Sequence, residues 1–123
     1  MTGQVRDFRD LTTWQRAMDL VPEVYRLVKK LPHEETFALG AQIRRAVVSI
    51  PANIAEGHAR QHTKEFLQHL SIARGSLAEL WTLLAAAVRL GYLGAEMVER
   101  LEERMAEIRK LLFGLSSRLR TRP

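Results

Sequence analysis

The 123 residues are enough for one domain with one hydrophobic core, since 46% of them are hydrophobic. The chain has no cysteine, which excludes disulfide bonds, thiolate metal ligands and a cysteine nucleophile. Nineteen Lys and Arg against fourteen Asp and Glu give a formal net charge of +5. This charge fits an anionic partner such as nucleic acid, and it equally fits a basic surface that serves only solubility.

The start of the chain, MTGQVRDFRD, has no apolar run after its charged residues, and no stretch reaches the roughly eighteen apolar residues that a membrane span needs. We therefore expect a soluble, cytoplasmic protein that does not contact a membrane. No segment alternates polar and apolar residues as a strand does, and prolines and glycines fall mainly between segments of helical period. The sequence predicts one all-α domain over residues 1–123, an antiparallel up-and-down four-helix bundle with short connections.

The first helix is predicted over residues 13–30. Thr12 and Gln15 have the spacing of a capping box at its start, and Pro32 follows its end. Pro22 lies inside the helical pattern, where it removes a backbone hydrogen bond and predicts a kink. The apolar face predicted to turn inward consists of Trp14, Ala17, Met18, Val21, Val24, Tyr25 and Val28.

The second helix, predicted over residues 34–59, carries a polar row that a plain amphipathic helix does not explain. Successive members lie three or four residues apart, so at about 100° per residue they share one narrow band. The members of this polar row are Gln42, Arg45, Ser49, Asn53, Glu56 and Arg60. Apolar or small residues flank the band on both sides, so the residues left to face water are Gly40, Arg44, Pro51 and His58.

Because of these two apolar flanks, the polar row is predicted to be buried or half-buried, where its members must satisfy one another's hydrogen bonds. Arg45 can reach Glu79 of the third helix, and Glu56 can accept from residues of its own helix. We interpret the row as a structural network that fixes helix register, with a subunit interface and a ligand or catalytic site as alternatives. The row keeps its phase through Pro51, which predicts a kinked but continuous helix.

The third and fourth helices are predicted over residues 63–91 and 95–119. Gly75 and Ser76 lie in the middle of the third helix, where small residues allow a neighbouring helix to approach closely. Its inward face is predicted to consist of Phe66, Leu67, Leu70, Ala73, Leu77, Leu80, Trp81, Leu84 and Val88. The fourth helix has a regular seam that must pack along another helix, of the same chain or of a second copy. The seam consists of Val98, Leu101, Met105, Ile108, Leu112, Leu115 and Leu119.

Residues 44–60, RRAVVSIPANIAEGHAR, resemble the signature of the bacterial four-helix-bundle proteins encoded in intervening sequences of 23S rRNA genes. The resemblance extends to DFRDLTTWQRAMDL at residues 7–20, to LPHEETFALGAQIRRA at residues 31–46, to EFLQHLSIARGSLAEL at residues 65–80 and to the GYL at residues 91–93. Pro22 and His58 depart from the family pattern. The resemblance implies a ring-like homopentamer. Some members resemble the accessory variability determinant of diversity-generating retroelements, a basic pentamer that binds nucleic acid and a reverse transcriptase.

We predict a non-enzymatic, homo-oligomeric protein that holds RNA or DNA phosphates with lysine and arginine and offers little base-specific readout. The candidate nucleic-acid-binding residues are Lys29, Lys30, Arg44, Arg109, Lys110, Arg118, Arg120 and Arg122. For the C-terminal members the alternative is that cations complement the dipole at a helix end. The alternative function is a protein-interaction scaffold encoded in an rRNA intervening sequence, without nucleic-acid affinity of its own.

The four histidines predict no metal site, because only His58 with His62, and His62 with His69, have helical spacing, and a turn falls among them. We expect them to be surface residues. The Glu-x-x-His motif of di-iron bundles does not occur on two helices. We therefore expect no metal, no cofactor and no catalytic residue.

Overall fold

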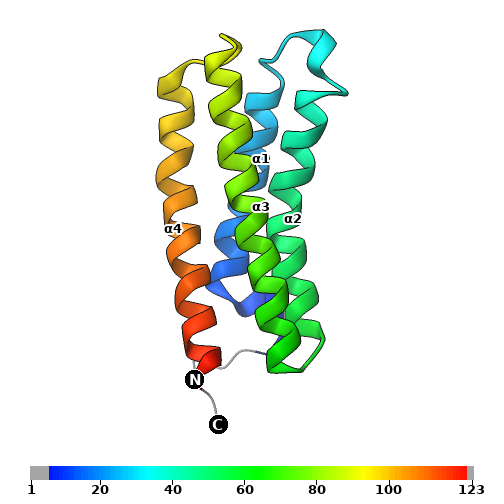
Figure 1. Ribbon diagram of the computed structural model, residues 1–123, viewed down its shortest axis with the longest axis vertical. Helices are drawn as coiled ribbons and strands as arrows, with labels where there is room; N and C mark the ends of the chain where they lie inside the picture. The colour runs from blue at the N-terminus through cyan, green and yellow to red at the C-terminus, as the bar shows by residue number, and fades with distance from the viewer. Residues whose placement is uncertain (1–5, 122–123) are drawn as a thin grey trace.

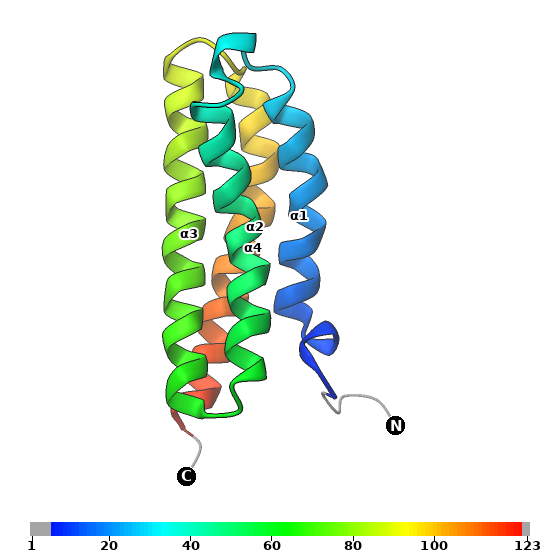
Figure 2. The same cartoon turned by 90° about the vertical axis from the view of Figure 1, so that its right-hand side faces the viewer.

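The computed structural model describes residues 6–121 and contains four long helices. These are α1 (Thr12–Val28), α2 (Leu39–Ala59), α3 (Thr63–Arg89) and α4 (Ala95–Arg120), with short 3-10 helices η1 (Phe8–Asp10) and η2 (His33–Glu35). Residues 6–121 include no strand. Neighbouring helices run antiparallel (Figure 1), and the view turned by 90° shows all four helices along one long axis (Figure 2). The predicted all-α four-helix bundle is confirmed.

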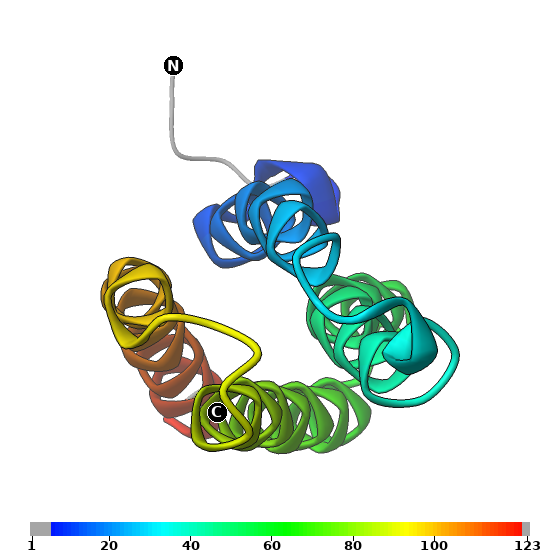
Figure 3. The same cartoon turned by 90° about the horizontal axis from the view of Figure 1, so that it is seen from above.

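Each helix packs against its neighbour in the chain, and α4 closes the bundle by packing against α1. Seen from above, the four helices stand around a common centre (Figure 3). The most extensive contact joins α2 to α3, whereas α1 and α4 are also joined by an ion pair between Glu23 and Arg104. Within the described residues, no helix combines the length and the apolar character required to cross a bilayer.

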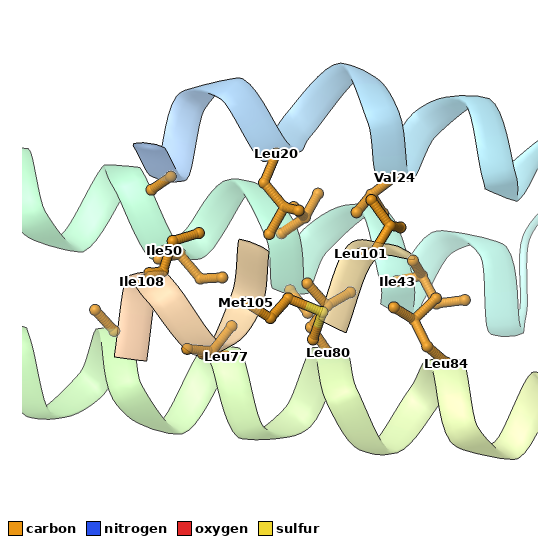
Figure 4. Close-up of a cluster of buried hydrophobic side chains, with 14 of the residues drawn as sticks. Leu20, Val24, Ile43, Ile50, Leu77, Leu80, Leu84, Leu101, Met105 and Ile108 are labelled. Carbon is orange, nitrogen blue, oxygen red and sulfur yellow. The ribbon is translucent and has the colours of Figure 1, made fainter. Parts of the chain in front are cut away.

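The core lies along the centre of the bundle and receives side chains from all four helices. The predicted seam of α4 is confirmed, because all seven of its residues are buried. Figure 4 shows the middle of this core, where side chains from every helix point toward one another. They include Leu20, Val24, Ile43, Ile50, Leu77, Leu80, Leu84, Leu101, Met105 and Ile108.

The first helix differs from its prediction in its cap and in its inward face. It begins at Thr12, but the predicted capping box does not form, because the Gln15 side chain donates to the Arg9 carbonyl at 2.8 Å. Leu20 is buried, whereas Met18 and Tyr25 are 41% and 39% exposed. The apolar residues of this segment form a stripe wider than the core needs, so periodicity alone did not decide which edge turns inward.

The second helix begins at Leu39, five residues later than predicted, because the preceding residues form η2 and a tight turn. The Glu35 carboxylate accepts from the Leu39 backbone N–H at 3.2 Å and so provides the new helix start with a partner. The helix then continues through Pro51 without a break, as predicted. The third helix ends at Arg89, where Gly91 adopts a φ of +79° and the Tyr92 N–H returns to the Ala87 carbonyl at 2.9 Å.

Candidate functional site

The polar row of α2 faces largely outward, so the prediction that it is buried or half-buried holds for only two of its six members in the single chain. Four of its members, Gln42, Arg45, Glu56 and Arg60, are exposed. Gly40 and Pro51, which were expected to face water, are buried instead. A Cβ atom on Gly40 would lie only 3.3 Å from Val28 Cγ1 of α1 and 3.0 Å from the Glu35 carbonyl oxygen. Gly40 therefore marks a close approach of α2 to α1 near the start of α2.

The two remaining members of the polar row, Ser49 and Asn53, are half-buried against α3 and are fully engaged. The Asn53 amide nitrogen donates to the Ser49 carbonyl at 2.9 Å and to Ser49 Oγ at 3.0 Å. Ser49 Oγ also lies 2.8 Å from Ser76 Oγ, and Asn53 Oδ1 lies 3.1 Å from His69 Nδ1. Because the amide oxygen can only accept, His69 Nδ1 carries the proton. This inner network joins α2 to α3 and supports the structural interpretation for these two residues.

Sequence reasoning missed both partners on α3. The sequence predicts only close packing at Ser76, but its buried hydroxyl also makes a hydrogen bond. His69 had been assigned to the surface, but it is half-buried beside Asn53. The available signal was their spacing, because His69 and Ser76 lie seven residues, or about two turns, apart and so share one face of α3.

The outer members of the polar row make weak contacts. Glu56 and Arg60 form an exposed ion pair one helical turn apart at 3.1 Å. Arg45 and Glu79 line the same open depression of about 680 Å³, but among the described residues no ion pair joins them. The predicted Arg45–Glu79 pair is therefore not formed.

The predicted nucleic-acid-binding residues do not form one patch. Lys29 and Lys30 are exposed at the end of α1, and Arg118 and Arg120 are exposed near the end of α4. These two helix ends lie at opposite ends of the bundle (Figure 1). Arg122 lies outside the described residues.

Two of the predicted phosphate ligands already have partners within the chain. The half-buried Arg44 guanidinium donates to the Thr36 carbonyl at 2.9 Å, so it holds the turn before α2. The Arg109 guanidinium lies over the Trp81 ring, 5.1 Å from its centroid. Trp81 is itself fixed by a 2.6 Å hydrogen bond from its indole nitrogen to Glu102.

The second half of α4 is the most uniformly basic part of the described chain. Glu107 is the last acidic residue of the sequence, and every charged residue after it is lysine or arginine. Lys110, Arg118 and Arg120 are exposed, and none of these three forms an ion pair with a described residue.

The segment formed by η2 and the turn that follows it, residues 33–38, presents an aromatic side chain to solvent. Phe37 is 89% exposed, more than any other large hydrophobic residue described. The turn around it is nevertheless tied down, because Tyr92 donates to Glu35 Oε2 at 3.0 Å and Thr36 Oγ1 donates to the His33 carbonyl at 2.7 Å. We call residues 33–38 the presenting turn. The sequence predicts that the second helix begins at residue 34, so helical periodicity does not reveal this turn.

The Tyr92–Glu35 contact predicts a pH effect. The hydrogen bond to Glu35, with burial and the negative charges of Glu35 and Glu34, raises the pKa of the Tyr92 phenol above its ordinary value of 10.0. A raised pKa in the folded state means that the contact stabilises the fold below pH 10.0 and is lost as the pH rises through the folded-state pKa. In a Tyr25→Phe background, where Tyr92 is the single tyrosine, the ultraviolet titration midpoint should lie above 10.0. Glu35→Gln should lower this midpoint, and an unchanged midpoint would contradict the assignment.

Among residues 6–121, no three His, Asp or Glu side chains lie together as metal ligands would. His58 instead packs edge-on against Phe66, with ring centroids 5.7 Å apart.

Comparisons with known proteins agree with this architecture. A comparison with curated proteins finds no match. The chain is similar to the crystal structure of a protein of unknown function from the S23 ribosomal protein family of Bacteroides thetaiotaomicron, with 27% sequence identity and a TM-score of 0.78. The similarity covers 85% of this chain and 98% of that one. The family model described as 23S rRNA-intervening sequence protein matches residues 9–114. The chain therefore belongs to the family of 23S rRNA-intervening sequence proteins.

Proposed function

We propose that this protein is a non-enzymatic homo-oligomer, pentameric as the family resemblance implies, that binds nucleic acid or a nucleoprotein. The observation that supports the proposal most is the second half of α4, where exposed lysine and arginine side chains occur without a single acidic residue. Such side chains hold phosphates whatever the base sequence. Assembly repeats each charge in every copy, so a modest patch in one chain becomes a strong field in the oligomer.

Two double variants with the same change of charge test which end of the bundle binds. Arg118→Gln with Arg120→Gln neutralises the end of α4, and Lys29→Gln with Lys30→Gln is the matched control at the end of α1. Fluorescence anisotropy with a labelled single-stranded RNA should show weaker binding for the first variant only. Its logarithmic salt dependence should become shallower by about 0.7 for each phosphate that the variant no longer neutralises.

Absence of polyanion binding by the wild-type protein at low salt would contradict the proposal, as would equal affinities of the two double variants and the wild type. In that case the alternative function, a scaffold that meets an acidic or RNA-bearing protein, is favoured. A pull-down with and without nuclease separates these functions, because a protein contact survives the nuclease.

The resemblance to the accessory variability determinant supports a finer proposal, in which the partner is a reverse transcriptase. The genes on either side of the gene for this protein test the proposed reverse transcriptase partner. A reverse transcriptase gene with a template repeat supports the retroelement role, whereas a location inside a 23S rRNA gene contradicts it.

A further inference from the structure

An apolar groove runs along the outer side of α3 beside α4 and has a volume of about 620 Å³. Its apolar lining includes Leu77, Trp81 and small residues such as Ala85 and Ala86. Hydrogen bonding to Glu102 and the Arg109 guanidinium hold the Trp81 ring in place, so the groove is formed before anything binds.

The rim of the groove is basic. Arg74, Arg89 and Arg109 line it, all three are exposed, and no acidic residue of the described chain is among its lining residues. An occupant that matches this surface has an apolar group to fill the groove and a negative charge beside it.

The presenting turn of the same chain has both features. Phe37 is its large apolar side chain and is 89% exposed, and Glu34, three residues earlier, is an exposed carboxylate. The hydrogen bonds from Arg44 and Thr36 hold the backbone of this turn, and the bond from Tyr92 holds its Glu35 side chain. Docking therefore has to order little more than the Phe37 side chain itself.

We infer that Phe37 of one copy inserts into the α3–α4 groove of a neighbouring copy, with Glu34 facing the arginine rim at the Arg89 end. The presenting turn extends beyond α2 on the side of the bundle away from α4 (Figures 1 and 3). One copy therefore cannot fill its own groove. The contact is heterologous, because it joins two different surfaces, the presenting turn of one copy and the groove of the next. Repeating such a contact gives either a closed ring or an open chain. This inference rests on the proposed homo-oligomer and identifies the surfaces that build it.

Sedimentation velocity without nucleic acid tests the inference. Phe37→Ser removes the inserted ring and should weaken self-association by roughly 10- to 150-fold, as expected for exposing one buried phenylalanine. Phe113→Ser is the matched control, because Phe113 is also an exposed phenylalanine, at 58%, but lies outside the groove lining. This control should keep the wild-type mass. Circular dichroism should show the wild-type helix content for both variants, since neither side chain is in the core.

A mixing experiment tests the direction of the contact. Ala85→Glu places a carboxylate in the groove opposite Glu34, so this variant keeps an intact Phe37 but loses its groove. Phe37→Ser keeps its groove but loses the ring. At a concentration where each variant alone is monomeric, the mixture should form a 1:1 dimer that cannot grow. A mixture that stays monomeric overturns the inference, and so does a Phe37→Ser variant that retains the wild-type mass. A monomeric wild type overturns the proposed oligomer as well, whereas loss of RNA binding with intact assembly affects only the proposed function.

Discussion

Replacing Gly57 with alanine is expected to destabilise the protein by about 1–3 kcal/mol, although alanine is the better helix former. The added Cβ would lie 2.6 Å from His69 Cβ and 3.0 Å from Phe66 Cδ1, both on α3. The first contact is with an atom attached directly to the backbone, so no side-chain rotation relieves it. The α2 and α3 helices would have to move apart along their most extensive contact.

Gly75→Ala is the matched control and should have the opposite sign. Gly75 also lies inside a helix, but an added Cβ meets nothing within 4 Å. The substitution should stabilise the protein by about 0.5–1 kcal/mol through the lower entropy of the unfolded chain. Urea unfolding at one fixed protein concentration measures both variants. Changes of the same sign would contradict the close approach at Gly57.

Asn53→Ala should cost about 1–3 kcal/mol, because it leaves the half-buried Ser49 and His69 groups without their partner. A double-mutant cycle with His69→Ala isolates the contact between α2 and α3. We expect a coupling free energy of about 0.5–3 kcal/mol between the two positions. If the two substitutions are additive, the inner network does not hold the helices together.

Glu56→Ala provides the control from the same polar row. Glu56 is exposed and makes only the pair with Arg60, so its loss should change stability by less than about 0.5 kcal/mol. The contrast between Asn53 and Glu56 checks the orientation of α2. A large effect at Glu56 in the monomeric protein would contradict an outward-facing position.

The fourth helix could be predicted almost completely from the sequence. Apolar residues recur at three- and four-residue spacing from Val98 to Leu119, and most other positions of the helix are charged or polar. Only one orientation buries such a stripe, so the structure agrees with the prediction residue by residue. The boundaries of α3 and α4 also fell within two residues, because Gly91 and Gly94 bracket the turn between them.

The orientation of α2 could not be predicted in this way. Periodicity shows which residues share a face, but this helix has apolar or small residues around most of its circumference. The prediction gave the outward position to Gly40 and Pro51, but both are buried, and Gly40 lies close to Val28 of α1. The inward side of this helix combines large aliphatic residues such as Ile43 and Ile50 with Gly40 and Pro51, and polarity alone does not reveal the last two.

The glycines and the presenting turn show a second limit of sequence reasoning. Gly75 was expected to lie at a close contact and is exposed, whereas the close contact lies at Gly57. Two helical glycines look alike in a sequence, because the distance to the facing helix depends on the whole packing. Phe37 was likewise one apolar residue among many inside a predicted helix, and it is distinctive only because the turn exposes its ring.

The two tryptophans lie in different surroundings, which gives the molecule a built-in optical signal. Trp14 packs edge-on against Phe8 near the start of α1, whereas Trp81 lies in the groove between the Glu102 carboxylate and the Arg109 guanidinium. A Trp14→Phe variant would keep one indole, at the place where a neighbouring copy is inferred to dock. Because indole emission depends on the polarity around the ring, the intrinsic fluorescence of this variant could follow dissociation on dilution without an attached dye.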